Sequence, residues 1–160
     1  MKIKLMTIGK IKETFYQDAI KEYAKRLKAY CELEFVEVND EAISKNSNAS
    51  LDNMIKEKEG ERLLSKIKDN EYVILLDFKD SKEYDSVEFA KHLDTLMTNG
   101  KSSITFVIGG SLGLGENIRK RGNEKILLSK MTFTHQMTKV IILEQIYRAF
   151  KILNNETYHK

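Results

Sequence analysis

The stretch Ile104-Thr105-Phe106-Val107-Ile108-Gly109-Gly110-Ser111-Leu112-Gly113-Leu114-Gly115 decides the fold. Its first five residues form a short, mostly apolar run, which is typical of a strand buried on both faces of a parallel sheet. Four glycines follow within seven residues, and glycine allows a backbone to turn tightly or to approach a ligand closely. The loop lacks the Gly-Lys-Ser/Thr of a P-loop and the spacing of a dinucleotide fingerprint. It therefore indicates either a ligand site or a tight structural turn.

Strands and helices alternate on both sides of this stretch. Residue alternation and apolar runs predict strands, whereas helical spacing and a capping box predict helices. The expected strands are 2–8, 33–38, 72–76, 104–108 and 125–128, and the expected helices are 14–30, 51–68, a segment between 85 and 100, 116–121 and 136–153. This order predicts an α/β fold with a mostly parallel sheet flanked by helices. Because no proline and no linker interrupts the chain, we expect a single domain over 1–160.

Ligands of parallel sheets bind beyond the carboxyl ends of the strands. Three such ends stand out, at Leu76-Asp77, Ile108-Gly109-Gly110 and Leu128-Ser129. Asp77 and the aspartates that follow it lack the spacing and the glycine of a calcium loop, so no metal is expected. If the glycine loop binds a ligand, these three strand ends are where we expect that ligand to lie.

Composition limits the class of protein. The chain has 160 residues, of which 41% are hydrophobic and 32% charged, and no apolar run approaches the roughly 20 residues of a membrane helix. A lone cysteine, Cys31, can form neither an internal disulfide nor a zinc site by itself. We therefore expect a soluble cytoplasmic protein with no membrane partner.

Positive charge is concentrated in the last third of the chain. Residues 1–100 hold 17 Lys/Arg and 20 Asp/Glu, whereas residues 101–160 hold 10 Lys/Arg and 4 Asp/Glu. The densest basic cluster is Arg119-Lys120-Arg121. A positive patch attracts the phosphates of nucleic acid, although a solvated charged surface of the fold is the simpler interpretation.

The last predicted helix, 136–153, is apolar over most of its circumference. Its polar stripe consists of Glu144, Arg148 and Lys151 only. A surface helix normally has a narrower apolar face, so this helix should be buried on two sides. A second copy of the chain or full coverage within one chain would achieve this, and we favour a homodimer.

Five segments together resemble one enzyme family. They are Val-Ile-Gly-Gly-Ser at 107–111, Leu-Ser-Lys-Met-Thr-Phe at 128–133, His-Gln-Met at 135–137, Glu-Gln-Ile-Tyr-Arg-Ala at 144–149 and Tyr-His-Lys at 158–160. The chain is similar over its whole length to the pseudouridine N3-methyltransferases of bacterial large-subunit (23S) ribosomal RNA, in the SPOUT superfamily. One difference is Thr134, where the family commonly has proline.

The resemblance implies a deep C-terminal trefoil knot, a homodimer and S-adenosylmethionine as the methyl donor. The donor would be held in the knot at the three strand ends. The cofactor-binding positions implied here are Leu76, Gly109, Leu128, Ser129, Lys130, Met131, Thr132 and Phe133. The implied substrate is ribosomal RNA on the assembled ribosome.

Methylation at N3 of a pseudouridine requires the loss of the imide proton, so a general base is expected near the acceptor. The candidates for this base are His135, Glu144 and His159. Arg148 could form an i,i+4 ion pair with Glu144, or it could instead hold a phosphate or orient the base. The resemblance implies that the C-terminal tail helps to complete the active site across the dimer, where Tyr158 could stack on the base and His159 could bond its edge. Two other functions stay open: a non-catalytic ribosome-binding protein with the same fold, and an enzyme that uses another nucleotide at the same strand ends.

Overall fold

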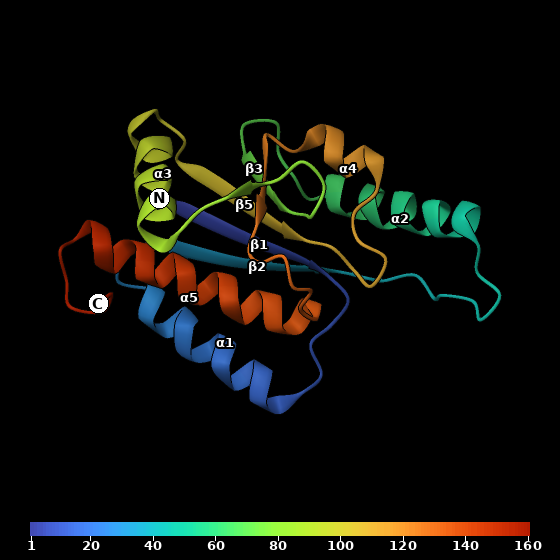
Figure 1. Ribbon diagram of the computed structural model, residues 1–160, viewed down its shortest axis with the longest axis horizontal. Helices are drawn as coiled ribbons and strands as arrows, with labels where there is room; N and C mark the ends of the chain where they lie inside the picture. Colours follow the sequence, from blue (N-terminus) through green and yellow to red (C-terminus); the bar gives the residue numbers. More distant parts are fainter.

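The computed structural model describes all 160 residues and contains one six-stranded sheet (Figure 1). The strands are β1 (Lys2–Ile8), β2 (Glu32–Val38), β3 (Tyr72–Leu76), β4 (Lys82–Glu83), β5 (Ser103–Ile108) and β6 (Glu124–Leu127). Their order across the sheet is β2-β1-β5-β3-β6-β4, and every neighbouring pair is parallel. The predicted α/β fold with a parallel sheet flanked by helices is therefore confirmed.

Helices cover both faces of the sheet. The helices are α1 (Thr14–Leu27), α2 (Ala49–Leu64), α3 (Ser86–Thr98), α4 (Glu116–Arg121) and α5 (His135–Leu153). Helices α1, α3 and α5 lie on one face, where alternate strand residues such as Leu5 and Phe106 form the larger core. Helices α2 and α4 cover the other face, where Met6 and Val107 pack with Leu63 and Ile118. Because β3 and β5 are buried on both faces, they appear as short apolar runs in the sequence. Strand β1 is also buried, but its sequence includes Lys2, Lys4 and Thr7.

Helix α5 packs between α1 and α3 on the sheet. This position buries seven of its residues within one chain: Lys139, Ile142, Leu143, Ile146, Tyr147, Ala149 and Phe150. The unusual width of its apolar face thus has an explanation within a single chain, which is the second of the two arrangements considered from the sequence. The homodimer stays a prediction that must rest on other features.

The capping box predicted at Asp85 and Glu88 is present. The Asp85 side chain accepts a hydrogen bond from the Glu88 N–H at 2.7 Å, and Glu88 accepts one from the Asp85 N–H at 2.9 Å. The same loop contains β4, a two-residue strand that has no apolar signal. Strand β6 lies between β3 and β4, although only residues 77–81 join those two strands. Threading of the chain through the loop after β3 would give this order, and the knot itself stays a prediction from the family resemblance.

None of the helices is both long enough and apolar enough to cross a lipid bilayer.

Candidate functional site

A cavity of about 730 Å³ lies at the carboxyl ends of β3, β5 and β6. Its lining comes from four segments, 76–78, 108–114, 126–129 and 131–136, and from Thr138. These segments include all three strand ends that the sequence singled out. Of the eight predicted cofactor positions, the seven that line this donor cavity are Leu76, Gly109, Leu128, Ser129, Met131, Thr132 and Phe133. The eighth, Lys130, is exposed and is not part of the lining.

The glycine loop forms the floor of the donor cavity by a tight turn. The Gly113 N–H donates to the Gly110 carbonyl at 3.0 Å, and Gly113 has a φ of +86°, which favours glycine. A Cβ atom on Gly109 would lie 3.0 Å from the Gly113 carbonyl carbon and 3.2 Å from the Leu114 side chain. The loop can therefore take this path only with a very small residue at position 109.

The donor cavity is nearly uncharged. No Lys or Arg lines it, and its single carboxylate, Asp77, is paired with Arg119 through contacts of 2.7 and 3.2 Å. Leucines and aromatic or methionine side chains form the apolar part of the wall, which suits the planar face of an adenine ring. A triphosphate or a dinucleotide would find no free cation here, so the geometry disfavours the other-nucleotide alternative.

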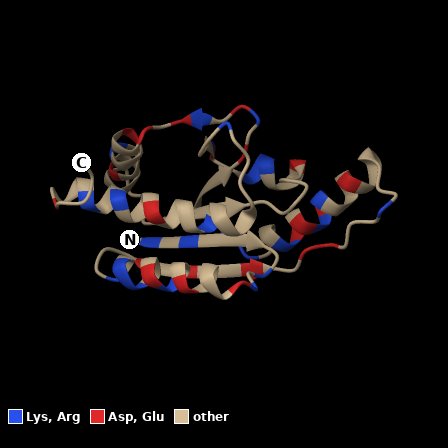
Figure 2. Cartoon of the chain, turned by 60° about the horizontal axis from the view of Figure 1, so that its bottom comes forward, with Lys and Arg blue, Asp and Glu red and all other residues tan.

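The basic cluster predicted from the sequence is largely used inside the fold. Arg119 holds Asp77 and also contacts Glu116 at 3.1 Å. Arg121 donates to the carbonyl oxygens of Lys68 and Glu71, both at 2.9 Å. These two side chains therefore tie α4 to the loops around β3. The two arginines are therefore neither simply solvated nor free to bind a phosphate. Figure 2 shows Lys and Arg mixed with Asp and Glu along the helices.

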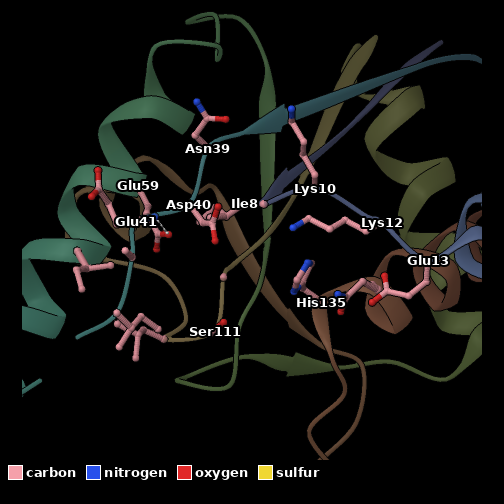
Figure 3. A pocket seen from close by; sticks show the side chains of 17 residues that line it. Ile8, Lys10, Lys12, Glu13, Asn39, Asp40, Glu41, Glu59, Ser111 and His135 are labelled. Atoms are coloured by element: carbon pink, nitrogen blue, oxygen red, sulfur yellow. Dashed lines mark hydrogen bonds between the residues drawn. The ribbon is translucent and has the colours of Figure 1, made fainter. Parts of the chain in front are cut away.

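A second cavity of about 650 Å³ adjoins the first, beyond the carboxyl ends of β1 and β2. It shares residues 110–112 and 135–136 with the donor cavity, so the two meet at the glycine loop and at the start of α5. We call it the polar cavity because most of its lining residues are polar or charged, as Figure 3 shows. Sequence reasoning missed it, because the carboxyl end of β1 carries no motif except Gly9-Lys10.

His135, a predicted catalytic residue, lines both cavities. Its Nε2 atom is buried and has no hydrogen-bond partner. Burial lowers the pKa of His135 below its ordinary value, although Glu13 and Asp40 nearby oppose the shift. Burial thus favours the neutral imidazole, in which one nitrogen can accept a hydrogen bond from a ligand.

Thr134 has a local role that proline could not fill. Its Oγ1 accepts a hydrogen bond from the Met137 N–H at 3.3 Å and caps the N-terminus of α5. The side chain thus satisfies one of the free N–H groups at the start of the helix that carries His135.

The other three predicted catalytic residues lie together at the far end of α5. The Arg148 guanidinium contacts Glu144 at 2.5 Å and His159 Nδ1 at 3.3 Å, and it lies over the Tyr158 ring. The Tyr158 hydroxyl donates to Glu144 at 3.1 Å. The C-terminal residues are therefore held against the helix. Because Glu144 is fully engaged, it is poorly placed to act as the general base.

His135 and Arg148 are 13 positions apart on one straight helix, or about 20 Å along its axis. Arg148, Tyr158 and His159 line neither cavity. Within one chain, the structure thus separates the predicted catalytic residues into two groups.

Comparisons with known proteins agree with this geometry. The family model described as "Predicted SPOUT methyltransferase" matches residues 1–159. This chain belongs to the SPOUT methyltransferase family. The chain is 51% identical to the ribosomal RNA large subunit methyltransferase H of Clostridium acetobutylicum and 49% identical to that of Clostridium beijerinckii. Both alignments cover 100% of each chain.

The SPOUT fold is also found among solved structures. A probable methylase family protein of Haemophilus influenzae matches with a TM-score of 0.53 and 14% identity, over 99% of this chain and 70% of that one. At this identity the match supports the fold alone. The resemblance read from the sequence is therefore confirmed at the level of family, fold and enzyme class.

Proposed function

We propose that this SPOUT methyltransferase transfers a methyl group from S-adenosylmethionine to N3 of a pseudouridine in large-subunit ribosomal RNA. The observation that carries the proposal is the full-length identity of about half to proteins named ribosomal RNA large subunit methyltransferase H. The pseudouridine and its N3 atom come from the family resemblance of the sequence motifs. The two adjoining cavities support a reaction between a donor and an acceptor.

The residues of the donor cavity fit S-adenosylmethionine. Leu76, Leu128, Met131 and Phe133 offer an apolar slot for adenine, and the Gly109 backbone can approach the ribose or methionine portion. The near absence of charge suits a donor with no phosphate. The donor supplies an activated methyl group, so the protein's part is to bind, to orient and to accept a proton.

We further propose that the site is completed by a second copy of the chain. Arg148 lies about 20 Å from His135 along α5, and Tyr158 and His159 pack against Arg148. Because none of the three lines a cavity of its own chain, they can serve a cavity only if it belongs to a partner. Apolar side chains are exposed around the mouth of the donor cavity, where Met131 is 75% and Phe78 56% exposed. A homodimer that covers these side chains would bring one chain's C-terminal residues to the other chain's cavities.

The substrate we propose is the assembled ribosome. Much of the local basic charge is used inside the fold, so affinity for naked RNA should be low and strongly dependent on salt. Methylation of a free RNA transcript should accordingly be much slower than methylation of ribosomes. Since bacterial ribosomes are cytoplasmic, we expect the protein to work there.

The test is transfer of radiolabelled methyl from S-adenosylmethionine to ribosomes from a strain that lacks this gene, followed by nuclease mapping. Label at a single pseudouridine is the expected result. Equal rates on transcript and ribosome would overturn the substrate proposal. No label, with an intact donor and with wild-type ribosomes shown to be modified, would favour the non-catalytic ribosome-binding alternative.

A further inference from the structure

Three carboxylates are buried in this protein, and only one of them lacks a cation. Glu71 is paired with Lys4 at 2.5 Å, and Asp77 is paired with Arg119 at 2.7 Å. Glu59 on α2 is 3% exposed but forms no ion pair. Its one hydrogen bond comes from the Glu41 N–H, which donates to Oε2 at 3.1 Å. A buried carboxylate without a cation is costly, so its presence needs an explanation.

The surroundings of Glu59 do not provide a hidden partner. Arg62 acts on Glu59 only through its charge, because its guanidinium contacts the Glu41 carboxylate and donates to the Asn39 carbonyl at 2.9 Å. Burial is the main cause that raises the pKa of Glu59 above its ordinary value. The carboxylate is therefore a stronger base than an exposed glutamate, and its Oε1 atom has no hydrogen bond within the chain.

Glu59 lies where the two cavities meet. Both of its carboxylate oxygens are 3.5 Å from the position that a Cβ atom would take on Gly110, in the glycine loop shared by the cavities. Helix α2 comes this close because Gly60 lets it pack on Asn117, where a Cβ atom would collide with the amide oxygen. The geometry thus brings an unpaired acceptor beside the donor cavity.

The opposite wall of the polar cavity carries the complementary charge. Lys10 and Lys12 lie across from Asp40, Glu41 and Glu59 in Figure 3, with His135 and Glu13 on the same side as the lysines. A nucleotide presents N–H donors at its base and negative charge at its phosphate. A wall of acceptors therefore faces a wall on which two lysines outweigh one carboxylate, and this arrangement matches both groups.

We propose that the polar cavity receives the base to be methylated and that Glu59 accepts the proton of its reacting ring N–H; this rests on the proposed function. The proton moves from the ring nitrogen to Oε1, and the electron pair stays on the nitrogen. That pair forms the bond to the methyl carbon while the carbon–sulfur bond of the donor breaks, its electrons remaining on sulfur. The proton then leaves Glu59 for water.

The direct test is Glu59→Gln, with Glu61→Gln as the matched control. Glu61 is an exposed residue of the same helix, its carboxylate forms no hydrogen bond or ion pair, and it lines neither cavity. Methyl transfer to ribosomes should fall by about 100-fold or more in the first variant and stay near wild type in the second. Affinity for S-adenosylhomocysteine, measured by calorimetry, should stay within about twofold for both, because the donor cavity is not altered.

A second variant, Ala42→Trp, fills the polar cavity from its exposed loop without touching the donor cavity. It should raise the KM for ribosomes and leave the binding of S-adenosylhomocysteine unchanged. Full activity of either variant would overturn the proposal, and so would loss of S-adenosylhomocysteine binding in Glu59→Gln. If the wild-type protein itself transfers no methyl to ribosomes, the proposed function fails. Failure of the role of Glu59 alone would instead leave the wild-type protein active.

Discussion

The Nζ atom of Lys4 lies 2.5 Å from Oε1 of Glu71, and the two side chains are only 5% and 4% exposed. Lys4 also donates to the Lys66 carbonyl at 3.0 Å, and Thr105 donates to the second Glu71 oxygen at 2.5 Å. This pair joins β1 and β5 to the residue before β3, at the edge of the sheet opposite the cavities. It therefore belongs to the stability of the fold.

Replacing Glu71 by Gln should destabilise the protein strongly, because it leaves the Lys4 charge buried without its counterion. Loss of one partner of a buried pair costs about 3–5 kcal/mol, which lowers the Tm of a chain of this size by roughly 10 °C. The measurement is thermal unfolding followed by circular dichroism. Glu22→Gln, at the exposed pair with Arg26, is the control and should leave the Tm nearly unchanged. A similar Tm for both variants would contradict the prediction.

The same pair predicts a pH dependence of stability. Burial alone would raise the pKa of Glu71, but the hydrogen bonds from Lys4 and Thr105 hold it below its ordinary value. A lowered pKa in the folded state gives stability that is present above the unfolded pKa, about 4.3, and lost as pH falls through the folded value. Denaturant titrations of wild type should show this acid loss, and Glu71→Gln should show less of it.

Gly109→Val should abolish the binding of the methyl donor. The added side chain would push on Gly113 and Leu114 and move the loop that floors the donor cavity. We expect the Kd for S-adenosylhomocysteine to rise about 100-fold, or about 3 kcal/mol, in calorimetry. Lys130→Ala should change it by less than about twofold, because the Lys130 side chain lies outside the cavity lining. Equal loss in both variants would mean that the 128–133 segment binds the donor through Lys130 as well.

Mixed dimers test the shared site. Gly109→Val leaves the C-terminal residues intact, and Arg148→Ala leaves the donor cavity intact, so each variant alone should be inactive. Co-expression should restore about a quarter of wild-type activity, because half of the dimers are mixed and each has one complete site of two. Sedimentation should show the dimer in all samples. If co-expression restores nothing, each tail serves its own chain or the variants do not exchange.

Glu59→Gln should not lower stability, and this distinguishes it from Glu71→Gln. Because the folded-state pKa of Glu59 is raised, the charged form destabilises the fold, and this cost appears as pH rises through the folded pKa. The neutral amide still accepts from the Glu41 N–H. At pH 7 we therefore expect the Tm of Glu59→Gln to equal or exceed that of wild type, measured by thermal unfolding. A lower Tm would show that the Glu59 carboxylate stabilises the protein.

Much of the fold could be predicted from local signals in the sequence. The apolar runs at 72–76 and 104–108 and the capping box at Asp85 each mark an element that the structure contains. Strand β4 had no such signal, because two exposed residues carry no pattern. Phe15, in the first turn of α1, is 66% exposed, although an apolar residue at helical spacing usually faces the core.

The donor cavity could be anticipated because its residues follow the ends of apolar strands. The burial of Glu59 could not be anticipated from the sequence. This residue lies in the charged run Lys56-Glu57-Lys58-Glu59-Gly60-Glu61, which is typical of an exposed helix. Its burial depends on the neighbouring glycine and on the packing of α2 against α4. Tertiary contacts of this kind leave no trace in periodicity or spacing.

The order of the strands has a consequence for protein synthesis. Strand β1 pairs with β2 on one side and with β5 on the other, so its second neighbour is made about 100 residues later. In a nascent chain that ends before residue 103, β5 has not been made, so the backbone groups of β1 that pair with β5 are exposed. Strand β6 is made later still and must then pair with β3. The sheet therefore forms late in translation or after release. Until then, its apolar strand edges are exposed to aggregation and available to chaperones.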